Sequence, residues 1–512
     1  MGLVSFPLLF FLNTSQFKGV VLYLFYYPNT LMQGFMIRFI FLLLIIQISC
    51  KGKEILIPPS SNNPTVGTIG VWKTSHDGSV LLYKQPINIK FSNNITADVN
   101  IDIDAANTRQ SMEGFGAALT GSSAYVLMKN LSSNQRINVL KDLFDPNTGI
   151  GISYLRLTIG ASDFSSTNYT YNDIALDQKD TALTSFSIAT EEEFLIPVLK
   201  EILAINPNVQ IMASPWSAPA WMKLNKSLTN GGKLDPTIYN TYANYFVKYI
   251  NAFASYGITI NAITVQNEPL YAAPYLSLEM SAQEQINFIK NAIGPAFVKN
   301  NIKTKILIYD HNWDRPDYPI TVLADSAARQ YVSGTAFHCY AGSVGAMSQV
   351  STQYPDKGIY FTECSGGEWA KDFGSNLAWN TENLIIGAPR NDAKNVLFWN
   401  LALDENFGPR NGGCQDCRGV IAVNSVNNQI QKNIEYYLIG HASKFVLYNA
   451  KRIVTADTRN AGISQVAYIN TDGTKVLLAY NHQSISQKIQ INENGKSFNY
   501  LIEPGSLVTF KW

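Results

Sequence analysis

Between residues 112 and 435 the chain alternates short β-type runs with longer amphipathic stretches of helical spacing. Eight strand candidates occur, in the order Met112–Leu119, Tyr154–Gly160, Val209–Ser217, Ile260–Pro269, Lys305–Trp313, Gly334–Gly342, Lys357–Gly367 and Asn395–Leu403. The helical stretches include Glu191–Ile205, Thr237–Tyr256, Ala282–Val298, Tyr318–Tyr331 and Gln429–Leu438. Eight such alternations are the count of a (β/α)8 TIM barrel. An open doubly wound sheet is the alternative, but no glycine-rich phosphate turn stands where that fold would need one.

Short β-type runs flank this region on both sides. Those before it are Ile69–Trp72, Ser79–Tyr83, Ile87–Phe91 and Val99–Ile103, with Asp77-Gly78 as a hairpin turn. Those after it are Arg452–Thr455, Gln465–Asn470, Lys475–Asn481, Gln487–Ile491 and Leu507–Trp512. Because the two groups bracket the barrel, we expect one discontinuous β-sandwich. The predicted domains are residues 66–108 and 441–512 for the sandwich and 109–440 for an α/β barrel.

The first 50 residues have the pattern of a leader rather than of a domain. Arg38 precedes a short apolar run, Phe39–Ile46, and Ile48-Ser49-Cys50 follows as a cleavage site that ends in small residues. This pattern predicts export. A cysteine at this place resembles a bacterial lipobox, so Cys50 is a candidate for lipidation, although Gln47 departs from the usual leucine. Simple secretion is the alternative, so the expected location is the bacterial cell envelope or the medium.

Residues 1–35 form a second apolar stretch upstream of Met36. They are interpreted as an overextended start, with an upstream membrane anchor as the alternative. Residues 51–65 are rich in Pro, Ser and Asn, as expected of a linker.

Charge excludes one class of partner. Lys and Arg number 39 and Asp and Glu 38, so the net charge is +1, without the excess of positive charge that nucleic-acid binding needs. Charged residues are only 15% of the chain, against about 25% in typical soluble proteins. With 27 Tyr and 8 Trp, this composition favours a neutral substrate that stacks on aromatic rings.

Five cysteines are too few for a disulfide scaffold. Cys414 and Cys417 form a Cys-x-x-Cys pair among glycines, with no further His or Cys nearby to complete a zinc site. The pair is interpreted as a small loop-closing disulfide or an inert pair. No metal and no cofactor is expected.

Two strand candidates end in a glutamate. Glu268 closes the fourth strand and Glu363 the seventh, 95 residues apart. Since catalytic residues of a TIM barrel lie at the carboxyl ends of its strands, the two carboxylates should face each other across the mouth. Paired carboxylates are what glycosidic cleavage requires, one as proton donor and one facing the positive charge that develops on the sugar.

Seven segments then resemble glycoside hydrolase family 30, which includes glucosylceramidases and endo-β-1,6-glucanases. They fall in order on seven of the eight strands: GFGAALTGSSA, YLRLTIGASDFS, SPWSAPAWMK, QNEP, FHCYAG, FTECSGG and FWNLAL. The resemblance extends over about residues 66–512.

This resemblance implies roles for the residues that carry the chemistry. Glu268 matches the acid/base and Glu363 the nucleophile, whose carboxyl groups should lie about 5–5.5 Å apart in a retaining enzyme. Asn267 matches an asparagine that hydrogen-bonds the sugar 2-hydroxyl. Arg156 and Tyr340 match the residues that contact the nucleophile.

Further residues match the sugar pocket of the family. Asp163 and Trp216 correspond to residues that grip sugar hydroxyls, and Trp399 to an aromatic floor under the sugar. His338 is expected to line the pocket, and the alternative is a histidine whose hydrogen bonds are satisfied within the protein. At the end of the fifth strand, Asp310, His311 and Trp313 are further candidates for substrate contact.

The resemblance implies a retaining β-glucosidic hydrolase, with endo-β-1,6-glucanase as the first expectation because the segment 404–419 resembles that branch. Glucosylceramidase is the alternative. A non-catalytic glycan-binding lipoprotein is a third, distant hypothesis. The expected partner is a neutral β-glucoside, β-glucan or glucosylceramide, with membrane contact only through the N-terminal lipid.

Overall fold

The structure is a computed structural model that describes residues 68–92 and 96–512. The described residues form one compact unit. The predicted leader, the linker and Cys50 lie outside the described residues. Among the described residues, no helix is both long and apolar enough to cross a membrane.

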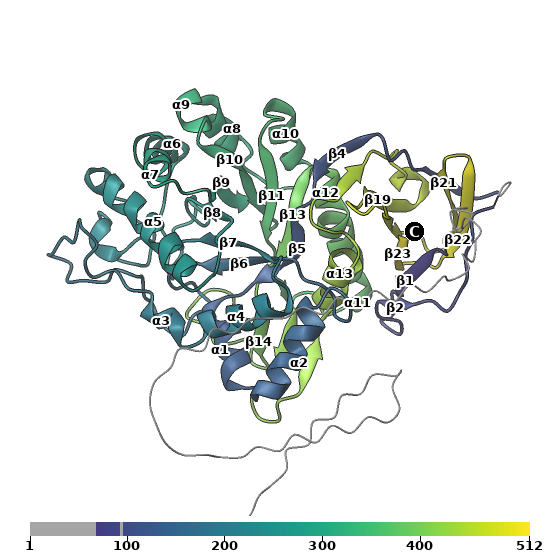
Figure 1. Cartoon of the computed structure of the whole chain (residues 1–512), viewed down its shortest axis with the longest axis horizontal. Coiled ribbons are helices and arrows are strands. Elements are labelled where there is room, and N and C mark those ends of the chain that lie inside the picture. The colour runs from purple at the N-terminus through teal and green to yellow at the C-terminus, as the bar shows by residue number, and fades with distance from the viewer. Residues whose placement is uncertain (1–67, 93–95) are drawn as a thin grey trace, which may run out of the picture. The chain divides into compact units, whose positions relative to one another are not determined.

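Eight parallel strands close into a barrel, as the alternation predicted (Figure 1). Their order around the barrel is β5, β6, β7, β8, β9, β10, β11 and β13, which returns to β5. The strands are β5 Gly114–Ala118, β6 Tyr154–Thr158, β7 Gln210–Ser214, β8 Ala262–Thr264, β9 Lys305–Asn312, β10 Val332–His338, β11 Gly358–Glu363 and β13 Ala393–Phe398. Helices cover their outer face, so both faces are buried and the strands are apolar runs without alternation.

The helices are α1 Gly121–Lys129, α2 Ser133–Phe144, α3 Ala189–Glu192, α4 Leu195–Ile205, α5 Tyr239–Ser255, α6 Ala282–Phe288, α7 Gly294–Lys299, α8 Asp317–Ala324, α9 Ser326–Arg329, α10 Ala346–Gln353, α11 Phe373–Asn380, α12 Gly387–Arg390 and α13 Ile434–Ser443. The helix expected over Gln429–Leu438 is wrong in its first part. Ile430–Lys432 instead forms strand β17, which pairs with β16, and the helix begins only after Asn433. A three-residue edge strand is too short for its alternation to be distinguished from a helical pattern.

Two small sheets extend the barrel mouth. The first joins β12 Gly366–Gly367 to β15 Cys417–Arg418, and the second joins β14 Ala402–Asp404, β16 Ile421–Val423 and β17. They hold the segment after β13 against the end of β11.

A sandwich of two sheets combines strands from both ends of the chain. One sheet has the order β2-β1-β23-β20-β19-β18-β4 and the other the order β22-β21-β3. The strands are β1 Gly70–Thr74, β2 Tyr83–Lys84, β3 Val99–Asp102, β4 Thr108–Ser111, β18 Lys451–Ile453, β19 Ile463–Ile469, β20 Lys475–Asn481, β21 Gln487–Glu493, β22 Lys496–Ile502 and β23 Leu507–Lys511. In Figure 1 the purple β1 lies beside the yellow β23, with which it pairs antiparallel.

The sandwich differs in detail from the prediction. Strand β4 pairs with β18, so its sheet continues beyond residue 108. Only Tyr83 and Lys84 of the region near Ser79–Tyr83 form a strand, because Asp77 ties Ser79 into a turn. No strand forms over Ile87–Phe91; Ile89 makes one isolated bridge to Ile69.

Helix α13 joins the barrel to the sandwich. The ring of His441, fully buried, is hydrogen-bonded to Thr74 and to Thr509 at 2.8 Å each. Desolvation lowers the pKa of His441 to about 3, so the ring is neutral and links the two parts without a buried charge.

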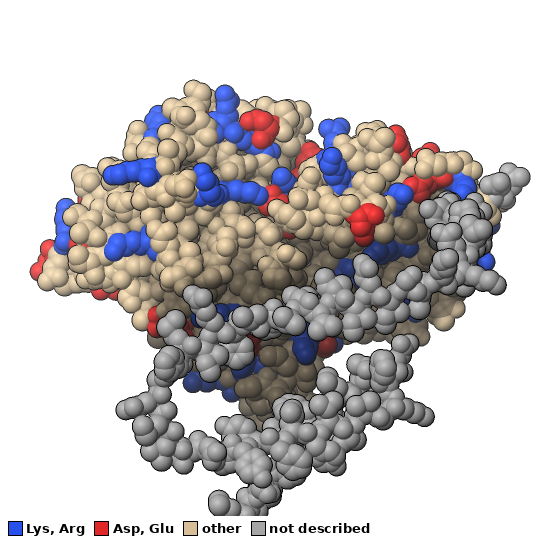
Figure 2. Space-filling view, in the orientation of Figure 1, with Lys and Arg blue, Asp and Glu red and all other residues tan. Residues whose placement is uncertain are grey.

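Charged side chains are sparse on the surface. On the face in Figure 2, Lys and Arg and Asp and Glu are scattered singly, without a broad patch of one sign. This distribution agrees with the balanced charge of the sequence.

Candidate active site

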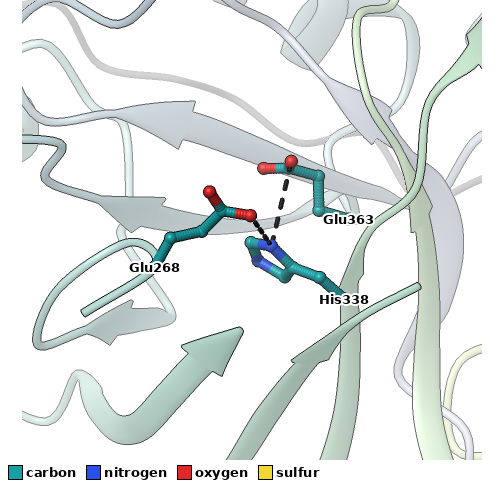
Figure 3. A group of neighbouring side chains, drawn as sticks. All are labelled: Glu268, His338 and Glu363. Atoms are coloured by element: carbon teal, nitrogen blue, oxygen red, sulfur yellow. Dashed lines mark hydrogen bonds and ion pairs between the residues drawn. The ribbon is translucent and has the colours of Figure 1, made fainter. Parts of the chain in front are cut away.

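Glu268 and Glu363 lie together at the barrel mouth. Their carboxylates point toward each other over the ring of His338 (Figure 3). An oxygen of each glutamate and a ring nitrogen of His338 lie within 4.8 Å of one another. This upper limit on the distance between two carboxylate oxygens is compatible with the ~5–5.5 Å separation of retaining glycosidases and is below the ~6.5–9.5 Å of inverting ones.

The backbone at Glu268 is left-handed, with φ at +45°. A non-glycine residue rarely adopts the left-handed region of the backbone. Glu268 adopts it directly before Pro269, so this turn is locally strained. The Glu268 N–H donates to Asp310 O at 3.0 Å, which fixes this turn to the next strand.

Arg156, fully buried on β6, connects the site from below. Its guanidinium donates to a carboxylate oxygen of Glu363, to Asn267 Oδ1 at 2.8 Å and to Asp310 Oδ2 at 2.8 Å. Tyr340 donates its hydroxyl to the second Glu363 oxygen at 2.9 Å. Both oxygens of Glu363 therefore accept hydrogen bonds that favour the ionised carboxylate.

A β-bulge directs Asp310 into the barrel. In the pairing of β9 with β10, Tyr309 and His311 oppose consecutive residues, so Asp310 is the extra residue between them. Tyr309 and Asp310 accordingly have φ at +72° and +59°. Bulges commonly redirect a side chain next to an active site.

Asp310 itself is fully buried. Besides Arg156, it accepts hydrogen bonds from Ser214 at 2.8 Å, Thr264 at 2.7 Å and Thr362 at 2.7 Å. These contacts hold its pKa well below the usual value against the effect of burial, chiefly through the charge of Arg156. The expectation that Asp310 contacts substrate is wrong, because the bulge turns its side chain beneath the site.

His338 was expected to line the pocket, and this is also wrong. Its ring is fully buried between two carboxylates, with Nδ1 3.1 Å from Glu268 Oε1 and Nε2 3.0 Å from Asp310 Oδ1. Burial alone would lower the pKa of His338, but the charges of Glu363 and Asp310 raise it to about 9. A protonated ring can donate from both nitrogens, so His338 is a cation beneath the glutamates at neutral pH.

The two glutamates titrate as a coupled pair. Burial raises the pKa of Glu363, whereas the hydrogen bond and charge of His338 hold the pKa of Glu268 below its usual value against burial. Carboxylates this close ionise together only at a cost, so the charge of each one raises the pKa of the other. Arg156 and Tyr340 donate to the two oxygens of Glu363 and so oppose the effect of burial on that carboxyl group.

A cavity of about 740 Å³ opens above the pair. Asp163, Trp216 and Trp399 line one end of it. The two tryptophan rings stack with centroids 5.1 Å apart and lie 4.9 and 5.6 Å from the Arg156 guanidinium. This end combines flat aromatic surface with one carboxyl group, which suits a pyranose ring and its hydroxyls.

Asp163 and Asn267 are each held by neighbours. Asp163 packs against Gly413, where a side chain would collide with the carboxyl group, and its carbonyl oxygen accepts from the Asn411 N–H at 2.6 Å. Burial, with the charges of the two glutamates, raises the pKa of Asp163 well above its usual value. Because Arg156 occupies Asn267 Oδ1, the amide NH2 of Asn267 is the group available to a ligand oxygen.

Family models match this architecture along its length. The glycosyl hydrolase family 30 TIM-barrel domain matches residues 112–446, and the family 30 beta sandwich domain matches residues 449–510. The chain belongs to glycosyl hydrolase family 30. It is therefore a glycoside hydrolase, as the seven segments predicted.

Relatives of known name agree with the family 30 assignment. An endo-1,6-beta-D-glucanase of Trichoderma harzianum is 36% identical over 75% of this chain and 80% of its own length. The structure of the endo-beta1,6-glucanase BT3312 is 36% identical with a TM-score of 0.81, covering 87% of this chain and 99% of that one. The lysosomal acid glucosylceramidase of Mus musculus is 28% identical over 79% of this chain and 81% of its own length.

Some residues of this family 30 cavity were missed or misplaced by sequence reasoning. His311 lines the cavity as expected, whereas Trp313 is buried against Phe361 and does not. The cavity residues that had not been singled out are Leu270, Tyr271, Tyr275, Tyr309, Asn312, Asp314, Arg315 and Trp369. Most of them stand within a few residues after a strand motif, which is the signal that could have identified them.

Two disulfides stand at the mouth of the family 30 barrel. Cys414 and Cys417 are bonded, one of the two interpretations of that pair, and both line the cavity. Cys339 and Cys364 form a second bond that had not been predicted. It joins the residues next to Tyr340 and Glu363, at the ends of the neighbouring strands β10 and β11.

The group that includes Glu268, His338 and Glu363 is also the arrangement that could hold a metal ion. Its donors are one ring nitrogen and two carboxylates. The His338 ring forms hydrogen bonds or ion pairs with Glu268, Glu363 and Asp310. These contacts within the protein account for the closeness of the three side chains without a metal ion.

Removing the charge of His338 should shift the pH dependence of catalysis. In His338→Gln the amide can still donate to Asp310, but the cation that lowers the pKa of both glutamates is lost. We expect both limbs of the kcat/KM profile to move to higher pH by about one unit or more, because unit charges ~4 Å apart interact by about 4 kcal/mol at an effective dielectric of ~20. Initial rates from pH 3 to 10 measure this. A profile that stays in place, as expected for the control His482→Gln at the surface, would contradict the role of His338.

Proposed function

We propose that this protein is a retaining endo-β-1,6-glucanase that cleaves a neutral β-glucan by double displacement. The observation that carries the retaining mechanism is the spacing of Glu268 and Glu363, within 4.8 Å. The substrate rests on the 36% identity to endo-1,6-β-glucanases.

In the first step Glu363 attacks the anomeric carbon of a glucosyl unit bound against Trp216, Trp399 and Asp163. The C–O bond to the leaving chain breaks, and Glu268 gives its proton to the departing oxygen. Glu268 accepts the His338 contact on Oε1, which leaves Oε2 to hold the transferred proton. Arg156 and Tyr340 keep Glu363 ionised for the attack.

In the second step water attacks the glucosyl ester on Glu363. Formation of the ester removes the negative charge of Glu363, which had opposed the ionisation of Glu268. The pKa of Glu268 therefore falls, and Glu268 acts as base toward the water. Water adds from the face that the leaving chain vacated, and the β configuration is restored. In this mechanism the NH2 of Asn267, whose Oδ1 already accepts from Arg156, donates to the sugar 2-hydroxyl in both steps.

A product assay on pustulan, laminarin, xylan and glucosylceramide tests the substrate. We expect pustulan, a β-1,6-glucan, to yield oligosaccharides. Glucosylceramide turnover without pustulan turnover would instead support the second candidate, glucosylceramidase, which the 28% identity to the mouse enzyme favours. Turnover of glucuronoxylan with none of any β-glucoside would overturn both. Glu363→Gln, purified in parallel, controls for contaminating hydrolases.

We further propose that the protein is exported, with Cys50 as the lipidated residue. The leader pattern is the basis of this proposal, and two disulfides support it because such bonds persist in oxidising compartments. Cys50→Ala should release the protein from membranes with its specific activity unchanged, as measured by fractionation and rate assays. Unchanged membrane association would point to residues 1–35 as the anchor instead.

A further inference from the structure

Two tryptophans stand out by their exposure. All eight tryptophans of the chain lie in the described residues. Only two of them are exposed, Trp369 by 57% and Trp379 by 44% of their surface. Neither is needed to fill a core. Large apolar side chains left in water at one place commonly mark a binding surface.

Both tryptophans line the same pocket, a hollow of about 590 Å³ beside the active site. Trp369 lies against Gly367 of β12, where any side chain would collide with its ring, and Trp379 lies near the end of α11. The neutral polar lining comes from Ser365, Ser375, Asn376 and Asn380, and one charge of each sign is added by Lys371 and Asp372. Aromatic faces with polar groups between them and no excess charge of one sign suit an uncharged sugar.

The pocket adjoins the catalytic cavity. Tyr340 and Trp369 line both of them, and the Tyr340 hydroxyl is the one that contacts Glu363. A chain bound at the glutamates can therefore continue across Tyr340 and Trp369 into this pocket.

The residues assigned to the cleaved glucosyl unit lie in the catalytic cavity and not in this pocket, namely Asp163, Trp216 and Trp399. The Asn411 N–H holds the loop that contains Cys414 and Cys417 against Asp163. A glucan whose cleaved glucosyl unit lies against these residues can reach the pocket only with a part of the chain beyond that unit, past Tyr340 and Trp369.

We propose that the pocket between Trp369 and Trp379 binds the leaving-group portion of the glucan, beyond the bond that is cleaved. This inference rests on the proposed function. The occupant is a neutral glucosyl chain, whose apolar ring faces stack on the tryptophans while its hydroxyls meet the amide and hydroxyl groups of α11 and Ser365.

Trp379→Ala tests the proposal, because Trp379 lines this pocket and not the catalytic cavity. We expect the KM for pustulan to rise about tenfold, the size of effect expected when one aromatic contact is lost from a binding surface. Hydrolysis of an aryl β-glucoside, whose leaving group is a phenol, should be unchanged. Tyr448→Ala is the matched control, since Tyr448 is 43% exposed and lies elsewhere. Melting temperatures of the variants confirm that they fold.

An aryl β-gentiobioside separates the two directions of the chain, because its second sugar lies on the side away from the leaving group. If Trp379→Ala weakens cleavage of this compound but not of the glucoside, the pocket holds the other part of the chain and the proposal is wrong. If pustulan kinetics are unchanged while wild type cleaves pustulan, the pocket inference fails and the proposed function stands. If wild type does not cleave pustulan, the function fails and this inference with it.

Discussion

Glu268→Ala and Glu363→Ala should give opposite anomers of glucosyl azide from the same reagents. The substrate is a β-glucoside of dinitrophenol, which departs without needing a proton. In Glu268→Ala the first step proceeds, but no base activates water, so the ester on Glu363 accumulates after a burst of phenolate. Azide needs no deprotonation and attacks the face opposite Glu363, which yields the β-azide and restores turnover.

In Glu363→Ala the nucleophile is missing and the space under the sugar is vacant. Azide can enter it and displace the phenolate in one step, which yields the α-azide. On pustulan, kcat/KM of Glu268→Ala should fall by about 10²–10⁴-fold, the usual contribution of a general acid. The products are identified by NMR of the anomeric proton.

The matched control is Glu363→Gln, which removes the charge but leaves no space for azide, so no rescue is expected. An α-azide from Glu268→Ala would show that the two roles are reversed. Full activity of both alanine variants on pustulan would mean that the pair is not catalytic.

Asp310→Asn should cost more stability than any single change at the surface. Its carboxylate is fully buried, pairs with Arg156 and contacts His338. An amide leaves both cations without their anion and turns an NH2 toward groups that donate. Breaking a buried pair on one side typically costs about 3–5 kcal/mol. Unfolding in urea measures the loss, and Asp356→Asn, with its side chain 68% exposed, is the control.

The loss should depend on pH. The pKa of Asp310 is lowered in the folded protein, so its contribution is present above the unfolded pKa of about 3.9 and is lost as pH falls below it. Wild type and Asp310→Asn should therefore differ most above about pH 5 and approach each other in acid. An equal difference at pH 7 and pH 3, or none at either, would contradict the role of the buried charge.

Much of the site follows from local sequence. The eight apolar runs define the barrel strands because a parallel sheet buried on both faces needs continuous apolar residues. Polar residues that end such runs must then meet at one rim. For this reason the sequence predicts that Glu268, Glu363 and Arg156 lie close together, since the carboxyl ends of all barrel strands meet at one face.

Other features depend on contacts that no local pattern encodes. Whether Asp310 faces the sugar or the interior depends on a bulge of one residue, which reverses the direction of a side chain. His338 is buried because Glu268 and Asp310 enclose it. Its pKa is raised by these two carboxylates and Glu363, which lie on other strands and turns and approach the ring only in the folded protein.

The same division applies to the mouth. Cys339 and Cys364 occupy equivalent places after β10 and β11, but that they bond depends on the register of the two strands. Trp369 and Trp379 are ordinary aromatic residues in the sequence, and only the tertiary structure leaves both exposed in one hollow. The sequence by itself determined the barrel and the identity of its candidate catalytic carboxylates, because periodicity and strand ends are local. Tertiary packing decided the hydrogen bonds and charges around them and the exposure of the two tryptophans, because charge and exposure depend on neighbours distant in the chain.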